Sequence, residues 1–181
     1  MNKLEKGQKG FTLIELMIAI GIAALITVGI TAATMQILTI NHRASNHMIA
    51  VRQVQQAGKE VSKDALQAQS VNASESSNGF PLTLTWDEWG TNQTNTIVYD
   101  FTDMPSGLKQ LERMHTFNGT EQATALPVVA QYIDDTIDSS TGEARTRCEW
   151  DPIDGVLTFT VTARVGTEIE TRIYEIEPRP D

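Results

Sequence analysis

The distribution of hydrophobic and polar residues divides the chain into three parts, and the first is the most apolar. Residues 16–41 contain no charged side chain over 26 consecutive positions. An α-helix rises 1.5 Å per residue, so this segment would span about 39 Å. That length exceeds the roughly 30 Å hydrocarbon core of a bilayer. The pattern therefore predicts a membrane-spanning helix.

The second part keeps the helical period but is apolar on one face only. Its apolar positions are spaced alternately by three and four, which is typical of an amphipathic helix. They are Met48, Val51, Val54, Gly58, Val61, Ala65 and Ala68. The intervening polar residues, from Arg52 to Asp64, are expected to face water or neighbouring subunits. We expect one helix from about residue 12 to about residue 69, whose second half packs through this small-residue stripe onto a globular head.

In the third part the period changes to two. Residues 70–79 are rich in Ser and Asn and are expected to end the helix as a loop. Alternating segments separated by turn sequences such as Asn118-Gly119 then predict strands at 82–86, 97–101, 108–115, 128–137, 144–150, 156–163 and 169–176. The predicted fold class is α+β, with a long N-terminal α-helix packed on an antiparallel β-sheet head.

Charge follows the same division. The first ten residues carry Lys3, Lys6 and Lys9 against Glu5, so this end is basic. From His42 onward the remaining 11 of 14 basic residues face 21 of 23 acidic residues, a net charge of −10. Short basic flanks remain in the cytoplasm, which places the acidic part outside. Phosphate would be repelled by it, so no direct nucleic-acid partner is expected.

The sequence offers little for catalysis. Cys148 is the single cysteine, which excludes an intrachain disulfide and favours a half-buried strand position. The three histidines, His42, His47 and His115, have no metal-binding spacing, and no catalytic set stands out. We therefore expect neither an enzyme nor a cofactor.

One acidic cluster is the only candidate for a metal. Asp134, Asp135, Asp138 and Glu143 lie close together in the sequence. Calcium would suit such oxygen ligands. The ordered spacing of an EF-hand loop is missing, so solvated carboxylates at a strand end are the preferred interpretation, and no metal residue is assigned.

The N-terminal stretch allows three interpretations. A cleaved secretory signal peptide requires a shorter apolar region. A plain signal anchor explains the length but not Glu15 or the Gly10-Phe11 junction. The third is a resemblance: the stretch Lys9-Gly10-Phe11-Thr12-Leu13-Ile14-Glu15 resembles the class III signal sequence of the type IV pilin superfamily.

The resemblance implies specific roles for three residues. A prepilin peptidase would cut between Gly10 and Phe11, and the same enzyme would methylate the new terminus at Phe11. Glycine lets the backbone enter a tight protease site without a Cβ clash. Glu15 would sit near the interface in the monomer and would pair, on assembly, with the terminal amine of a neighbouring subunit, because a buried carboxylate needs a partner. The alternative is an interfacial glutamate without such a role.

These expectations define four segments. They are a leader at 1–10, a transmembrane and assembly helix at 11–41, an amphipathic helix at 42–70 and a β-sheet head at 71–181. The protein would be single-pass in a bacterial inner membrane, with its N-terminus inside, its head outside, and membrane lipid and other pilin or pseudopilin subunits as partners.

A looser resemblance concerns the head. A strand containing Tyr99, a strand containing Leu111 and Arg113, and a strand with Val129-Ala130 are similar to those of J-type minor pseudopilins and W-type minor pilins. This favours a minor structural subunit of a type IV pilus or a type II secretion pseudopilus. A membrane-anchored extracellular binding module remains the alternative.

Overall fold

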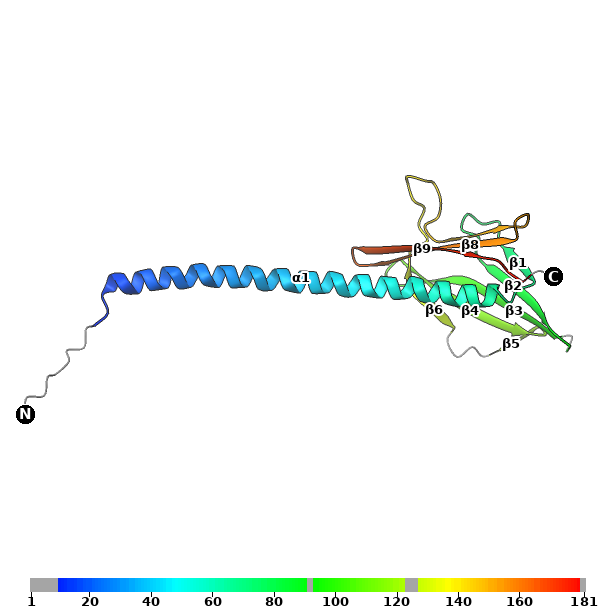
Figure 1. Ribbon diagram of the computed structural model, residues 1–181, viewed down its shortest axis with the longest axis horizontal. Helices are drawn as coiled ribbons and strands as arrows, with labels where there is room; N and C mark the ends of the chain where they lie inside the picture. Colours follow the sequence, from blue (N-terminus) through cyan, green and yellow to red (C-terminus); the bar gives the residue numbers. More distant parts are fainter. Residues whose placement is uncertain (1–9, 91–92, 123–126, 180–181) are drawn as a thin grey trace, which may run out of the picture. The chain divides into compact units, whose positions relative to one another are not determined.

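The computed structural model describes residues 10–90, 93–122 and 127–179 and confirms the α+β fold. A long helix, α1 (Leu13–Ala65), is followed by an antiparallel sheet (Figure 1). The chain divides into two compact units, Met1–His42 and Arg43–Asp181. The predicted helix start at about residue 12 agrees with the observed one.

In the first unit, α1 buries nothing within the chain. Every described residue from Gly10 to His42 is exposed. The helix is long and apolar enough to cross a membrane by length and composition. Its large apolar side chains are therefore free to contact lipid or other helices.

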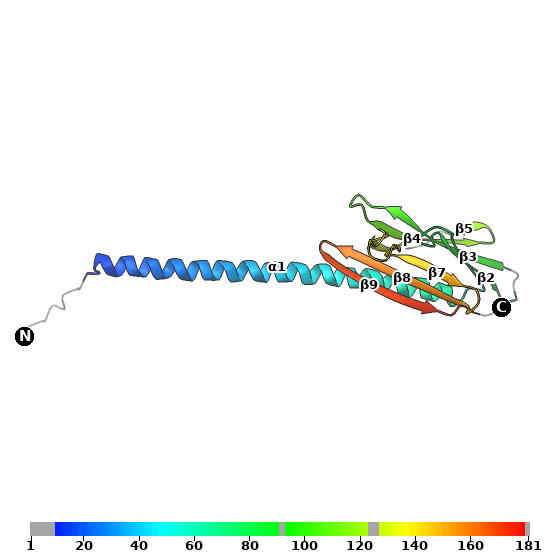
Figure 2. The same cartoon turned by 90° about the horizontal axis from the view of Figure 1, so that it is seen from above.

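The second unit contains the sheet. Its strands are β1 (Ser70–Ala73), β2 (Leu82–Glu88), β3 (Gln93–Asp103), β4 (Lys109–Phe117), β5 (Thr120–Gln122), β6 (Val128–Ile133), β7 (Arg147–Asp151), β8 (Val156–Val165) and β9 (Glu168–Ile176). The order across the sheet is β1-β2-β3-β4-β6-β8-β7, with β5 paired to β4 and β9 to β8. The views in Figures 1 and 2 show the C-terminal part of α1 running along this sheet.

The helix ends about four residues before the predicted boundary. Gln67 and Ala68 donate backbone hydrogen bonds to Asp64 and Ala65, which tightens the last turn. The backbone N–H of Gln69 then donates to Thr85 O at 2.9 Å and joins the sheet. Pairing with β2 therefore ends the helix.

The expected loop at residues 70–79 is wrong over its first four positions. Ser70 to Ala73 form β1 and pair with β2 from Thr85 to Leu82. A sequence rich in Ser and Asn predicts a loop. A short edge strand nevertheless tolerates polar residues when the neighbouring strand supplies the backbone hydrogen bonds.

Two other predicted strands are too long. The strand expected at 128–137 ends at Ile133, and the one expected at 144–150 begins at Arg147. Between them, Ile137 and Ala144 form only an isolated bridge. The polar segment that connects β6 to β7 is held by backbone hydrogen bonds, such as Arg145 N to Thr136 O at 2.9 Å, and by side-chain hydrogen bonds.

The helix contributes small residues to the core. Ala50, Val54, Ala57, Val61 and Ala65 are fully buried. They pack against large side chains of the sheet, among them Leu82, Leu84, Ile97, Tyr99, Leu111, Phe159 and Val161. The predicted stripe of small residues is confirmed from Val54 onward, but Met48 is 63% exposed, and the first fully buried residue of the helix is Ala50.

Gly58 shows why the stripe must be small. A Cβ at this position would overlap the ring of Tyr174 in β9. The Tyr174 hydroxyl crosses the helix surface and donates a hydrogen bond to Val54 O at 3.2 Å. Glycine therefore permits the close approach of α1 and β9.

Candidate functional site

The predicted processing residues lie immediately before α1. Gly10 and Phe11 precede the first helical residue, Leu13, and Phe11 is 89% exposed. A Cβ at Gly10 would meet no atom within 4 Å. Packing in the described part of the chain therefore does not require glycine here. The Gly10–Phe11 peptide bond lies on exposed, non-helical chain, which is the form that a protease active site can bind.

Glu15 closes a capping box at the start of α1. Its Oε2 accepts hydrogen bonds from Thr12 N at 2.9 Å and from Thr12 Oγ1 at 2.8 Å. In return Glu15 N donates to Thr12 Oγ1 at 3.3 Å. This reciprocal arrangement satisfies backbone donors that every helix start leaves unpaired. This role of Glu15 was not predicted, although the spacing Thr-x-x-Glu before an apolar run signals it.

The part of α1 from Leu16 to Ile40 carries no charged side chain and exposes large apolar side chains. Between Leu13 and Ile40 the large aliphatic side chains are 54% to 77% exposed. The threonine hydroxyls in this stretch are satisfied inside the helix: Thr27, Thr31, Thr34 and Thr39 each donate to the carbonyl four residues earlier at 2.8–2.9 Å. Because these hydroxyl groups need no external partner, this N-terminal part of α1 suits a lipid or helix-bundle environment.

A buried ion pair connects α1 to the sheet. Asp64 is 2% exposed, which corrects the expectation that it faces water. Its Oδ2 lies 2.6 Å from Arg113 Nε and accepts a hydrogen bond from the Tyr99 hydroxyl at 2.6 Å. Tyr99 and Arg113 are directly opposite each other on β3 and β4. The sequence signal was a carboxylate inside an apolar stripe, between Val61 and Ala68.

The local environment shifts two pKa values in this cluster. Burial, and then the charge of Asp64, raise the pKa of Tyr99 far above its usual range, so the phenol stays protonated and acts as a donor. Burial, the largest single effect, would lower the pKa of Arg113, but the hydrogen bond and the charge of Asp64, together with Tyr99, outweigh burial and the pKa is raised. The cluster is thus a fixed structural contact rather than an acid–base site.

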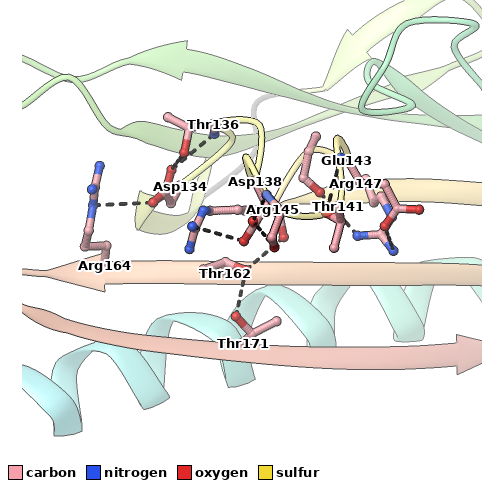
Figure 3. A network of polar contacts seen from close by, with 12 residues as sticks. Asp134, Thr136, Asp138, Thr141, Glu143, Arg145, Arg147, Thr162, Arg164 and Thr171 are labelled. Carbon is pink, nitrogen blue, oxygen red and sulfur yellow. Dashed lines mark hydrogen bonds and ion pairs between the residues drawn. The ribbon is translucent and has the colours of Figure 1, made fainter.

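The acidic cluster between β6 and β7 is neutralised by arginines, as Figure 3 shows. Asp134 is 1% exposed, so it is not the solvated carboxylate that the sequence suggested. Its Oδ1 accepts from Thr136 N and Oγ1 at 3.1 and 2.6 Å, and its Oδ2 lies 3.4 Å from Arg164 Nε. A buried carboxylate without such partners would be costly.

The other carboxylates of this cluster also have cationic partners. Asp138 lies 3.1 Å from Arg145, Glu143 lies 2.9 Å from Arg147, and Asp135 lies 3.8 Å from Lys109. Hydrogen bonds from Ser140, more than the nearby arginine, lower the pKa of Asp138. Within the described ranges 10–90, 93–122 and 127–179, no group of three His, Cys, Asp or Glu side chains is arranged to hold a metal.

The cysteine and the three histidines, the remaining candidates for catalysis, lie in surroundings that indicate no catalytic role. Cys148 is buried in β7, and burial raises the pKa of its thiol. His115 in β4 hydrogen-bonds Asn95 Oδ1 at 2.9 Å, and burial, with the charge of Arg113 second, lowers its pKa. His42 and His47 are exposed on α1. These positions provide no nucleophile with an adjacent base.

Comparison with known proteins identifies the N-terminal segment. A family model described as the prokaryotic N-terminal methylation motif matches residues 6–31. The matched residues include Gly10, Phe11, Glu15 and the first half of the exposed apolar helix. The chain thus carries a class III signal sequence of the type IV pilin superfamily, as the resemblance indicated. The motif points to a structural subunit rather than an enzyme.

Other comparisons add nothing to this assignment. The search of curated proteins found no match, and neither did the search of solved structures.

Proposed function

We propose that the protein is a minor pilin or pseudopilin, a structural subunit that initiates or caps a type IV pilus or a type II secretion pseudopilus. In this proposal a prepilin peptidase cleaves the chain between Gly10 and Phe11 and methylates Phe11. The mature protein then stays in the inner membrane as a single-pass protein with its head outside. Its partners are other pilin or pseudopilin subunits.

The proposal depends most on one observation. The N-terminal methylation motif at residues 6–31 overlaps the part of α1, Leu13 to Ile40, in which the large apolar side chains are all exposed. Burial of apolar surface yields about 25 cal/mol per Å², so this segment gains from transfer into lipid, and packing against other helices then adds van der Waals contacts. Cleavage before Phe11 would retain this surface on the mature protein.

The capping box fits a second role for Glu15. The described hydrogen bonds from Thr12 use only Oε2. Oε1 is thus available for the ammonium group that cleavage would create at Phe11 of a neighbouring subunit. An ion pair in apolar surroundings favours one axial register between subunits, because other registers leave a charge unpaired.

The assignment to a minor subunit depends on the head. The residues of the looser resemblance, Tyr99, Leu111, Val129 and Ala130, are all core residues with at most 5% exposure, and Arg113 anchors Asp64. They therefore support a similar head architecture but identify no binding surface. Initiation or capping is proposed because a large, irregular head is tolerated where a filament ends.

The mature N-terminus tests the proposal directly. Mass spectrometry of the membrane-extracted protein should find a chain that begins at Phe11 and carries one methyl group. A chain that begins at Met1, or well past residue 30, would contradict it. A membrane-anchored binding module is the alternative, and it predicts membrane association without co-purifying pilin subunits.

A further inference from the structure

Trp89 directly follows β2, at the turn end of the β2–β3 hairpin, and it does not belong to the hydrophobic core. Trp89 is 88% exposed, and Leu66, just after α1, is 57% exposed. Both line a pocket of about 480 Å³ together with the half-buried Trp86. Tryptophan has the largest apolar surface of any residue, so its exposure beside a pocket is characteristic of a binding surface.

The rest of the pocket lining is polar. It consists of Gln67, Asp87, Glu88, Asn95 and Arg179. An apolar peptide or a lipid chain would remove these groups from water without replacing their hydrogen bonds, which is unfavourable. Polyanions such as nucleic acids are disfavoured as well, because Asp87 and Glu88 would repel phosphate.

Several of the polar groups are held in place. Asp87 Oδ1 accepts a hydrogen bond from Thr94 Oγ1 at 2.7 Å, and Asp87 N donates to Gln69 Oε1 at 2.7 Å. Asn95 lies opposite Trp86 in the β2–β3 register, and its Oδ1 accepts from His115. The second Asp87 oxygen and the Asn95 amide N–H groups can therefore meet a ligand at low entropic cost.

We propose that this pocket binds an uncharged saccharide of gluco configuration. A pyranose whose hydroxyls are all equatorial has a flat face of axial C–H groups, which stacks on an indole ring. Its rim of hydroxyls both donates and accepts, which matches the carboxylates of Asp87 and Glu88 and the donors of Asn95 and Arg179. The proposed ligand thus satisfies the aromatic and polar parts of the lining together. This inference does not depend on filament assembly.

The experiment uses the full chain in detergent micelles and two probes, cellotetraose and chitotetraose. Saturable binding of at least one, measured by calorimetry and by a change in tryptophan fluorescence, is expected. Trp89→Ala should weaken binding at least about tenfold, the loss of about 1.4 kcal/mol of contact energy. Ile153→Ala is the matched control, because Ile153 is 92% exposed and does not line the pocket. This control should bind like the wild type.

Folding does not complicate the test, since Trp89 is exposed and its removal should leave the melting temperature unchanged. Failure of both probes to saturate, or equal binding by Trp89→Ala and the wild type, overturns the proposal. An anionic probe of the same gluco configuration, the β-1,4-linked tetramer of glucuronate, should bind more weakly than either neutral probe. Equal or tighter binding of this probe would contradict the role given to Asp87 and Glu88.

Discussion

Asp64 near the end of α1 and Arg113 in the middle of β4 form a buried ion pair, with Asp64 Oδ2 2.6 Å from Arg113 Nε. The two residues are 49 positions apart in the chain. Tyr99 donates to the same carboxylate oxygen, so helix, β3 and β4 meet at one atom. The contact fixes the rotation of the helix about its axis, because a carboxylate turned away from Arg113 would leave a buried charge without a partner.

Removing one member of this pair should destabilise the head. Asp64→Ala leaves Arg113 and Tyr99 without their acceptor and should cost about 3 kcal/mol in the free energy of unfolding. Chemical denaturation of the detergent-solubilised chain, followed by tryptophan fluorescence, measures this. Glu149→Ala is the matched control: its ion pair with Arg147 is exposed and should contribute less than about 1 kcal/mol. Equal effects of the two substitutions would argue against a special role for Asp64.

Gly58 gives a prediction whose sign depends on its neighbour. Alanine is the better helix former by about 1 kcal/mol. Its Cβ would nevertheless overlap the Tyr174 ring, and overpacking of this kind costs about 1–3 kcal/mol. Gly58→Ala should therefore lower the free energy of unfolding. In a Tyr174→Ala background the overlap is absent, and the same substitution should raise it. A destabilising effect in both backgrounds would show that the ring is not the cause.

Glu15→Gln separates the charge of Glu15 from its capping role. Glutamine also closes a capping box, so the helix start is retained while the negative charge is lost. We expect this variant to co-purify with fewer partner subunits than the wild type. The complementary variant Thr12→Ala weakens the cap, typically by about 1 kcal/mol, but keeps the charge, and should assemble nearly normally. Normal assembly of Glu15→Gln together with poor assembly of Thr12→Ala would show that Glu15 acts only as a capping residue.

Gly10→Val tests the processing site. A β-branched side chain obstructs close backbone approach in a protease site, so the precursor should accumulate uncut in the membrane. The fold is not affected, because Gly10 has no neighbour within 4 Å. Gly7→Val, three residues earlier, is the control and should be cut normally. Immunoblotting for the size of the chain distinguishes the two, and normal cutting of Gly10→Val would place the cleavage elsewhere.

The acidic segment between β6 and β7 should be indifferent to calcium. Asp134, Asp138 and Glu143 are already paired with arginines, so a cation would have to displace those partners. Melting temperatures in a chelator and in about 1 mM calcium should agree, since a ligand stabilises only the state that binds it. A clear rise in melting temperature with calcium would indicate that this segment binds the ion.

Local patterns in the sequence were sufficient to predict the long helix, the signal sequence and most of the strands. The uncharged run of residues 16–41 predicted a membrane-compatible helix, because length and apolar composition are properties of the local sequence alone. The order Gly10, Phe11, Glu15 identified the signal sequence. Period-two segments bounded by turns such as Asn118-Gly119 predicted most strands, since alternation and turn chemistry act over a few residues.

The tertiary structure decided what depends on partners distant in sequence. Asp64 was expected to face water, but β3 and β4 supply Tyr99 and Arg113 to bury it. Ser70–Ala73 form a strand because they pair with the edge of β2. Asp134 can be buried because Arg164 neutralises its charge and Thr136 donates hydrogen bonds to it. The exposed Trp89 could not be distinguished in advance from Trp86, which is half-buried and packs against the core. Local sequence fixes periodicity and turns, whereas the free energy of a polar side chain depends on which groups the fold brings beside it.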